Sequence, residues 1–335
     1  MLADAWFGLI LLSLLMYVVL DGYDLGIGVA TLFERNRAHR REMLEQVAQA
    51  WDGNESWLVL LAISLRAGFP QAFGSILPHA YLALIVMLLS LIVRGVSVEM
   101  ASQTGPAPRW ERAFGVGSLV AAVAQGVVLA TLAYRVSTVG GEFSGSTFGA
   151  FGWFSVLTAV TVTLVYLTLG YAYMKWKATG DLRAKVARRG GVTALLAAVL
   201  VLLCLVAAGH TAAPLTVHGA GRTASFVALL VLAATGAVVT VVTMRPTSRA
   251  DGAPLVGLST STVAVAVAVV VARYPVLVPG VPSVGDTVAP HATMLFLAIG
   301  IGINMPLILF YTWFGHHAFR TKAYGTGARL PRSTP

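Results

Sequence analysis

Acidic residues at four positions of apolar sequence could carry proton chemistry. Asp21 and Asp24 lie in the stretch LDGYDLGIG, and Asp52 and Glu55 lie in the stretch WDGNESWL. Each pair is spaced i to i+3, which places both acids on one face of a helix. Ionisable residues inside a membrane are rare, and they mark ion or proton pathways by default. The spacing therefore predicts a site that binds and releases protons.

The two acid pairs are expected to meet between the first two helices. The loop that joins these helices is centred near Asn36, so Asp21 and Asp52 each lie about 15 residues, or roughly 20 Å, from it. Arg94 and Glu99 follow in the third apolar segment and add an opposite charge and another acid. The cluster predicts proton or ion conduction, with one alternative left open: a salt-bridge network around Arg94 that only holds the helices together.

The elements that carry these residues are typical of a polytopic membrane protein. The 335 residues are 57% hydrophobic and only 11% charged, unlike an average soluble domain. The first apolar run has no basic segment before it and no small-residue cleavage site after it, so we expect a membrane span rather than a removable signal peptide. The net charge of +9 comes from short loops between helices rather than from a basic patch interleaved with aromatics. This distribution argues against nucleic acid as a partner and for the lipid bilayer.

Nine apolar segments are long enough for about 20 helical residues each. They predict an all-α fold and a single integral membrane domain over residues 1–335, with helices near 5–33, 44–67, 77–99, 113–135, 151–174, 191–209, 223–244, 255–272 and 292–316. Segment 44–67 is the weakest, because polar WDGNE interrupts it. Of the 23 Lys and Arg residues, 18 fall in loops on one side, four on the other side and Arg94 inside a span. This asymmetry predicts an outer N-terminus and a cytoplasmic C-terminus.

Histidine and cysteine give weaker signals. Pro78-His79 and Pro290-His291 are each expected to open a helix on the outer side, since proline suits the first turn. The remaining histidines are not expected to face one another across the bilayer, as two axial haem ligands would. Cys204 is single and lies in an apolar run, so neither an intrachain disulfide nor a thiolate metal site is expected. The residues therefore predict no haem and no metal in this chain.

Two motifs in order, LDGYDLGIG and WDGNESWL, resemble the first two helices of subunit II of the cytochrome bd quinol oxidases. The similarity continues through LIVRGVSVEM (91–100), LGYAYMKWKATGDL (169–182) and PLILFYTWF (306–314), and so covers nearly the whole chain. Two departures, in KWKATG (175–180) and from Ser56 onward, are more similar to the cyanide-insensitive branch of the family. Neither departure changes a motif acid.

The resemblance implies a fold, a partner and a reaction. The fold is two four-helix bundles plus one peripheral helix, in the cytoplasmic membrane of a bacterium. The partner is a larger subunit I, which binds b- and d-type haems and oxidises quinol within a heterodimer; whether small accessory membrane subunits join is left open. The complex reduces dioxygen to water and generates proton motive force. This chain is expected to bind no haem and to supply scaffold and a proton path from the cytoplasm.

The resemblance also distributes roles among the residues. Asp52 matches an acid of the family motif and is the expected principal proton relay, with Glu55 one turn deeper and with Asp21 and Asp24 feeding or tuning it. The residues expected to hold the geometry or to pack against the relay are Arg94, Glu99, Trp51, Asn54 and Trp57. Two alternatives stay open: a purely structural assembly subunit of the same oxidase, and a proton-coupled secondary transporter, which would also bury acids near the midplane.

Overall fold

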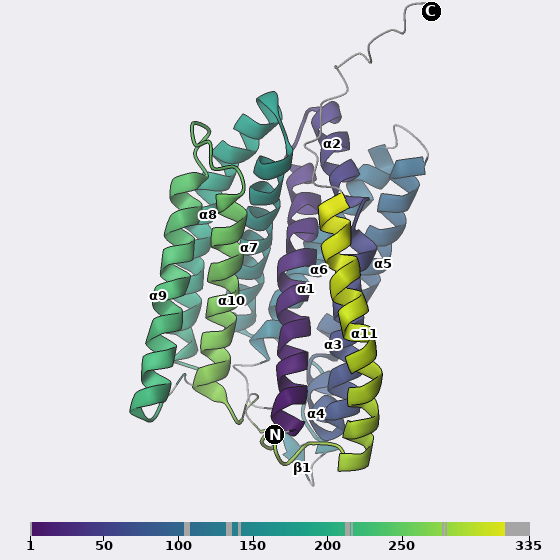
Figure 1. Cartoon of the computed structure of the whole chain (residues 1–335), viewed down its shortest axis with the longest axis vertical. Coiled ribbons are helices and arrows are strands. Elements are labelled where there is room, and N and C mark those ends of the chain that lie inside the picture. Colours follow the sequence, from purple (N-terminus) through teal and green to yellow (C-terminus); the bar gives the residue numbers. More distant parts are fainter. Residues whose placement is uncertain are drawn as a thin grey trace, which may run out of the picture.

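The computed structural model describes residues 2–318, apart from 104–107, 132–135, 140–141, 212–214, 216, 277 and 279. Within these residues the chain is almost entirely helical. Its two strands, β1 (Thr138–Val139) and β2 (Glu142–Phe143), form one short antiparallel pair. The helices stand side by side along the long axis of the molecule (Figure 1). The predicted all-α class is confirmed.

In the part of the chain that the structure describes, eight helices are long and apolar enough to cross a membrane. They are α1 (Leu2–Leu32), α5 (Tyr81–Gln103), α6 (Pro108–Ala130), α7 (Trp153–Lys177), α8 (Gly180–Ala208), α9 (Ala220–Thr243), α10 (Ala253–Arg273) and α11 (His291–Ala318). Each coincides with one of the nine predicted spans. The chain is therefore a multi-pass membrane protein.

The predicted second span, 44–67, is the exception. It falls across the end of α2 (Arg37–Val47) and most of α3 (Trp51–Gly68), and a further short helix, α4 (Pro70–His79), follows. α3 has only 18 residues and carries three charged side chains, Asp52, Glu55 and Arg66, so its own composition does not mark it as a membrane span. It nevertheless packs along α1 within the bundle. The count of nine spans therefore stays a prediction.

A second correction concerns Pro78-His79. This pair was predicted to open a helix, but α5 starts at Tyr81, and the pair forms the end of α4. Pro70 opens α4 instead. Proline suits this position because backbone N–H groups in the first turn of a helix have no partner within the helix, so the missing N–H costs nothing. The other prediction of this kind is confirmed, since α11 begins at His291.

Two helix boundaries also differ from the prediction. α6 spans Pro108–Ala130 rather than 113–135, and residues 132–135 lie outside the described part of the chain. α8 begins at Gly180 rather than near 191, so residues 180–190, which were predicted as a loop, are helical. The basic residues of this segment therefore project from a helix that extends beyond its apolar portion.

Contacts between charged residues bring four basic segments to one end of the bundle. Three ion pairs join these segments: Glu34 with Lys185 (2.7 Å), Arg40 with Glu111 (3.1 Å) and Arg183 with Asp251 (2.6 Å). The pairs connect the α1–α2 junction with α6 and α8, and α8 with the α9–α10 loop. This gathering agrees with the uneven distribution of Lys and Arg between loops; that this end faces the cytoplasm stays a prediction.

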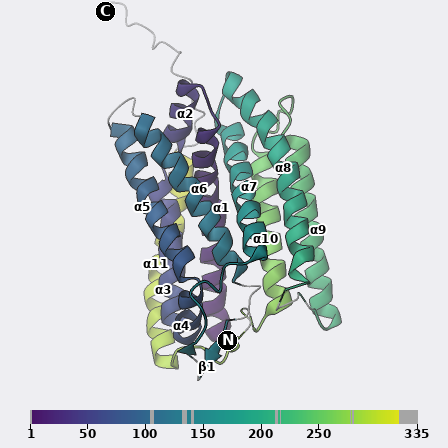
Figure 2. The ribbon, with the colours of Figure 1, turned by 180° about the vertical axis from the view of Figure 1, so that it is seen from behind.

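α1 occupies the centre of the helical array. It packs against α3, α6 and α7, with α8 to α10 on one side and α3, α5 and α11 on the other in both views (Figures 1 and 2). A side chain at Gly26 would overlap the carbonyl oxygen of Tyr166 on α7, and one at Gly28 would overlap Ser118 on α6. The glycines of the LDGYDLGIG motif therefore allow three backbones to approach closely. This contact sets the position of the neighbouring acids.

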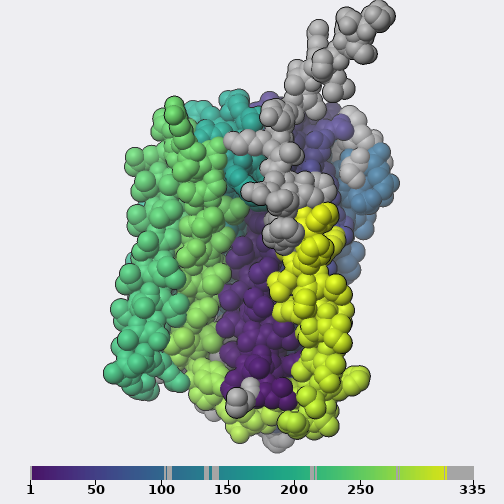
Figure 3. Space-filling view, viewed as in Figure 1, coloured from purple at the N-terminus to yellow at the C-terminus, as the bar shows by residue number. Residues whose placement is uncertain are grey.

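α11 lies at the edge of the array and is exposed along much of its length. Phe296, Ile303 and Leu307 are each more than 60% exposed. Tyr311 of this helix covers Gly53 of α3, where an added side-chain carbon would come within 2.9 Å of the tyrosine ring. In the space-filling view α1 is visible between α10 and α11 (Figure 3). α3 and α11 together form an outer face of the molecule.

Candidate functional site

A buried ion pair joins α1 to α5. Arg94 Nη2 lies 2.6 Å from Asp21 Oδ1, and both side chains are fully buried. Each charge compensates the other inside a region of low dielectric, where an isolated charge would be strongly unfavourable. The structure therefore brings together the first motif acid and the arginine, as the sequence predicts.

Asp24 lies on the same buried side of α1 and is held by α3. Asn54 Nδ2 donates to Asp24 Oδ2 at 2.8 Å and to the hydroxyl oxygen of Tyr23 at 2.9 Å. The Tyr23 ring in turn stacks on Tyr173 of α7, with ring centroids 4.3 Å apart. The predicted supporting role of Asn54 thus has a geometric basis, because its amide fixes the Asp24 carboxylate.

Glu55 completes the group from α3. Its side chain is half-buried, and it interacts electrostatically with Arg94 and Asp21. Arg94 also interacts with Asp24. Three carboxylates therefore share one guanidinium. At least one of them can bind a proton while another still balances the positive charge of Arg94. This excess of acids over cations suits proton binding.

Asp52 does not join this group, which corrects the predicted convergence of both acid pairs. It is exposed, and its Oδ1 accepts a hydrogen bond from the backbone N–H of Gly53 at 2.8 Å. Asn54 takes the side of α3 that faces α1, and a residue two positions earlier is rotated by about 200° around the helix. Asp52 consequently points outward from the bundle.

Glu99 and the tryptophans take different positions. Glu99 is exposed and accepts a hydrogen bond from Gln103, because it lies about 140° around α5 from Arg94. Trp51 is half-buried and covers Gly95 of α5. Trp57 is fully buried. Glu99 thus points away from Arg94, and the two tryptophans occupy packed positions on α3; the predicted roles of all three residues stay predictions.

Two buried donors of the cluster, Nε and Nη1 of Arg94, have no hydrogen-bond partner among the described residues. Nε1 of the buried Trp57 on α3 likewise has none. Buried polar groups in native proteins are normally satisfied by protein or by ordered water. The site thus retains donors that could hold small polar molecules between its side chains.

One buried hydrogen-bonded trio was not predicted from the sequence. Tyr166 donates from its hydroxyl to Gln125 Oε1 at 2.7 Å, and Gln125 Nε2 donates to the hydroxyl oxygen of Tyr17 at 2.7 Å. The trio links α7, α6 and α1, one turn from Asp21. Its only signal in the sequence is an amide in the middle of an apolar segment, and neither tyrosine could be paired with it without the fold.

A second unpredicted cluster surrounds Glu34, just after α1. Lys185 Nζ lies 2.7 Å and Arg189 Nη1 3.3 Å from its carboxylate, which also accepts the backbone N–H of Asn36 at 2.8 Å. Burial tends to raise the pKa of Glu34, but the hydrogen bonds from Lys185 and Asn36 and the charge of Arg189 outweigh it, so the pKa is lowered. Ionised Glu34 therefore connects the end of α1 to α8 through ion pairs.

No set of three or more His, Cys, Asp or Glu side chains within the described residues could hold a metal ion. His316 and His317 belong to the last turn of α11, and their side chains lie outside the described part. That this chain binds no haem stays a prediction.

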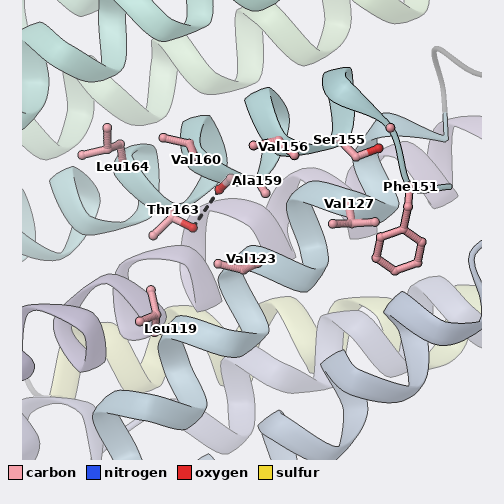
Figure 4. Close-up of a pocket in the computed structure, with 11 residues that line it drawn as sticks. Leu119, Val123, Val127, Phe151, Ser155, Val156, Ala159, Val160, Thr163 and Leu164 are labelled. Atoms are coloured by element: carbon pink, nitrogen blue, oxygen red, sulfur yellow. Dashed lines mark hydrogen bonds between the residues drawn. The ribbon is translucent and has the colours of Figure 1, made fainter.

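An apolar groove between α6 and α7 is separate from the acids (Figure 4). It is lined by Leu119, Val123, Val127, Phe151, Val156, Val160 and their neighbours. The hydroxyl of Thr163 donates to the Ala159 carbonyl at 2.8 Å, so it is turned to its own helix. The groove contains no charged side chain and takes no part in the candidate proton site.

Comparison with known proteins identifies a family for nearly the whole chain and individual relatives for a little over half of it. The family model described as cytochrome bd terminal oxidase subunit II matches residues 2–319. The chain is 30% identical over 213 residues to cytochrome bd-I ubiquinol oxidase subunit 2 of Escherichia coli K12, covering 61% of this chain and 55% of that protein. It is 29% identical over 188 residues to cytochrome bd ubiquinol oxidase subunit 2 of Bacillus subtilis, covering 54% of this chain and 55% of that protein. These alignments span little more than half the length of the relatives.

The fold has a counterpart among solved structures. A chain of the bd oxidase from Geobacillus thermodenitrificans superposes with a TM-score of 0.76 at 17% sequence identity, over 95% of this chain and 98% of that one. At this identity the likeness establishes a shared fold.

Proposed function

This chain belongs to the cytochrome bd terminal oxidase subunit II family, and on that premise we propose that it is the second subunit of a quinol oxidase. The proposed complex couples oxidation of a quinol to reduction of dioxygen to water. We place the haems and the quinol chemistry in the partner subunit, and a scaffold and a proton path in this chain. The observation that carries the proposal is the fully buried Asp21–Arg94 pair with two further carboxylates around it.

Proton transfer accounts for the surplus of acids in this site. A structural ion pair needs one acid for one arginine, whereas Asp21, Asp24 and Glu55 share Arg94. Ionisable groups held inside a membrane and exceeding their counter-charges are typical of proton relays. The unpartnered donors of Arg94 could orient water between these carboxylates.

The exposure of Asp52 supports a partner on the outer face of α3. A carboxylate on a membrane-embedded surface is unfavourable against lipid, and Asp52 shares this face with Ser56, which is also exposed. The neighbouring α11 exposes a further polar residue, Asn304. We therefore propose that the haem-bearing subunit covers α3 and α11. Asp52 would then pass protons across the interface, with Glu55 between it and the buried cluster.

A structural role has its own support and remains the second candidate. The Asp21–Arg94 pair connects α1 to α5, and Asn54 connects α3 to α1. Such contacts would stabilise the array even if no proton moved through them. Asp52 makes none of these interhelical contacts. The two candidate functions therefore predict different effects of neutralising it: a proton path predicts slower oxygen consumption, and a purely structural role predicts normal oxygen consumption once the complex has assembled.

The proposal is tested by isolating the chain with whatever binds it. The tagged chain is purified from its native membrane in mild detergent, and a reduced-minus-oxidised spectrum is recorded together with oxygen consumption on added quinol. We expect a larger subunit, b-type haem bands with or without d-type bands, and quinol-dependent oxygen uptake. A chain that remains intact, alone and free of haem would contradict the proposed function.

A further inference from the structure

We propose that the junction of α1, α2 and α8 binds the headgroup of an anionic phospholipid. The site, which we name the α1–α8 basic patch, consists of Arg35, Lys185, Arg188 and Arg189, with the ring of Phe33 beside the α1 end. It lies at the end of the bundle that gathers the basic loops (Figure 1). This inference concerns a surface remote from the proposed proton path and does not depend on it.

The basic side chains converge because a single buried acid draws two of them together. Lys185 and Arg189 both contact the carboxylate of Glu34, which is 0% exposed. Their own side chains remain 30% and 35% exposed, so each presents part of its charge to the surroundings. Arg35 and Arg188, adjacent in sequence to this cluster, are exposed. Two cations therefore contact the one acid and two more lie next to them in the sequence, so the patch retains a net positive charge.

The patch lies at the depth expected of lipid headgroups. Phe33 directly follows α1 and is 58% exposed, and Arg35 comes two residues later. On α8, Arg188 and Arg189 immediately precede the long apolar portion of the helix. At about 1.5 Å per helical residue these charges lie within a few ångströms of the ends of both apolar segments. The exposed Phe33 ring is placed to contact an acyl chain while the cations contact the phosphate.

Charge complementarity selects the class of lipid. Basic pockets between membrane helices bind anionic headgroups, and each Lys or Arg near an anionic surface adds to the attraction. A zwitterionic lipid carries no net charge and would gain little from the patch. The occupant is therefore a phospholipid with net negative charge rather than lipid in general.

The test uses the whole purified complex. After delipidation, dioleoylphosphatidylglycerol or dioleoylphosphatidylcholine is added in detergent, and bound lipids are counted by native mass spectrometry. The variant Arg35→Gln/Arg188→Gln removes two exposed charges and leaves the Glu34 contacts in place. The matched control Arg245→Gln/Arg249→Gln removes two exposed charges from the α9–α10 loop.

We expect the wild type to retain phosphatidylglycerol in preference to phosphatidylcholine, the patch variant to bind it severalfold more weakly, and the control to behave as wild type. Raising the salt concentration should release the lipid from the wild type, since exposed charges are screened. Equal retention by the patch variant, an equal loss in the control, or salt-resistant binding would each overturn the proposal. Oxygen consumption is not the readout, so a failure here leaves the proposed oxidase role untouched.

Discussion

Arg94 is the residue on which the buried charges depend. It forms an ion pair with Asp21 and interacts with Asp24 and Glu55. Removing one member of a buried pair leaves an uncompensated charge, whereas removing both members can be nearly neutral. The ion pair can therefore be separated experimentally from the protonatable acids around it.

We predict that Arg94→Gln destabilises the protein by about 3–5 kcal/mol, the usual effect of breaking a buried pair. The double variant Asp21→Asn/Arg94→Gln should recover part of that loss, because the Asp21 carboxylate, the direct ion-pair partner of Arg94, is then no longer left charged without its guanidinium. The measurement is the midpoint of thermal unfolding of the purified protein. A double variant less stable than Arg94→Gln alone would show that the pair is not the source of the effect.

Glu34 predicts a dependence of stability on pH. Its pKa in the folded protein is below the ordinary value of 4.5, so ionised Glu34 favours the folded state above about pH 4.5. This contribution disappears as the pH falls through the folded pKa. Glu34→Gln should therefore be less stable than wild type at pH 7, with the difference narrowing below pH 4.5. Thermal unfolding at a series of pH values measures it, and a pH-independent difference would contradict the ion-pair origin.

Close contact between α1 and α7 is the feature at the scale of elements that positions the acids. Gly26 leaves no space for a side chain against Tyr166, whereas Gly8 on the same helix has no atom within 4 Å of an added carbon. We predict that Gly26→Ala forces the helices apart and lowers the yield of folded protein, while Gly8→Ala has little effect. Size-exclusion profiles of the two variants provide the comparison. Equal yields would show that α1 can shift without loss.

The elements show where sequence reasoning succeeds and where it stops. Long apolar runs with basic ends predicted eight of the membrane helices, because lipid demands length and hydropathy. The prediction of one helix over 44–67 was wrong, because the charged helix α2 ends at Val47 and α3 begins as a separate helix at Trp51. The meeting of Asp21 with Arg94 was predicted, because charged residues inside membrane segments are expected to pair with one another. The outward direction of Asp52 could not be foreseen, since it depends on which side of α3 faces α1.

At the scale of the whole molecule, the protonatable groups are divided between an interior and a surface. The interior holds Asp21, Asp24 and Arg94, and the outer face of α3 holds Asp52. The likeness to a bd oxidase chain covers almost the entire fold. An exposed outer face that carries a motif acid is suited to contact with a second subunit, in which the proposed proton path would continue.

The proposed path through Asp52 is tested most directly by oxygen consumption of the assembled complex carrying Asp52→Asn, with Ser56→Ala on the same face as the control. Both variants should assemble with the full haem spectrum, since neither residue contacts the buried cluster. We predict that Asp52→Asn slows quinol-dependent oxygen consumption by about a hundredfold or more, the range typical of removing a proton-transfer group, while Ser56→Ala keeps normal turnover. Normal turnover of a fully assembled Asp52→Asn complex would contradict the account, and loss of assembly would favour the structural role instead.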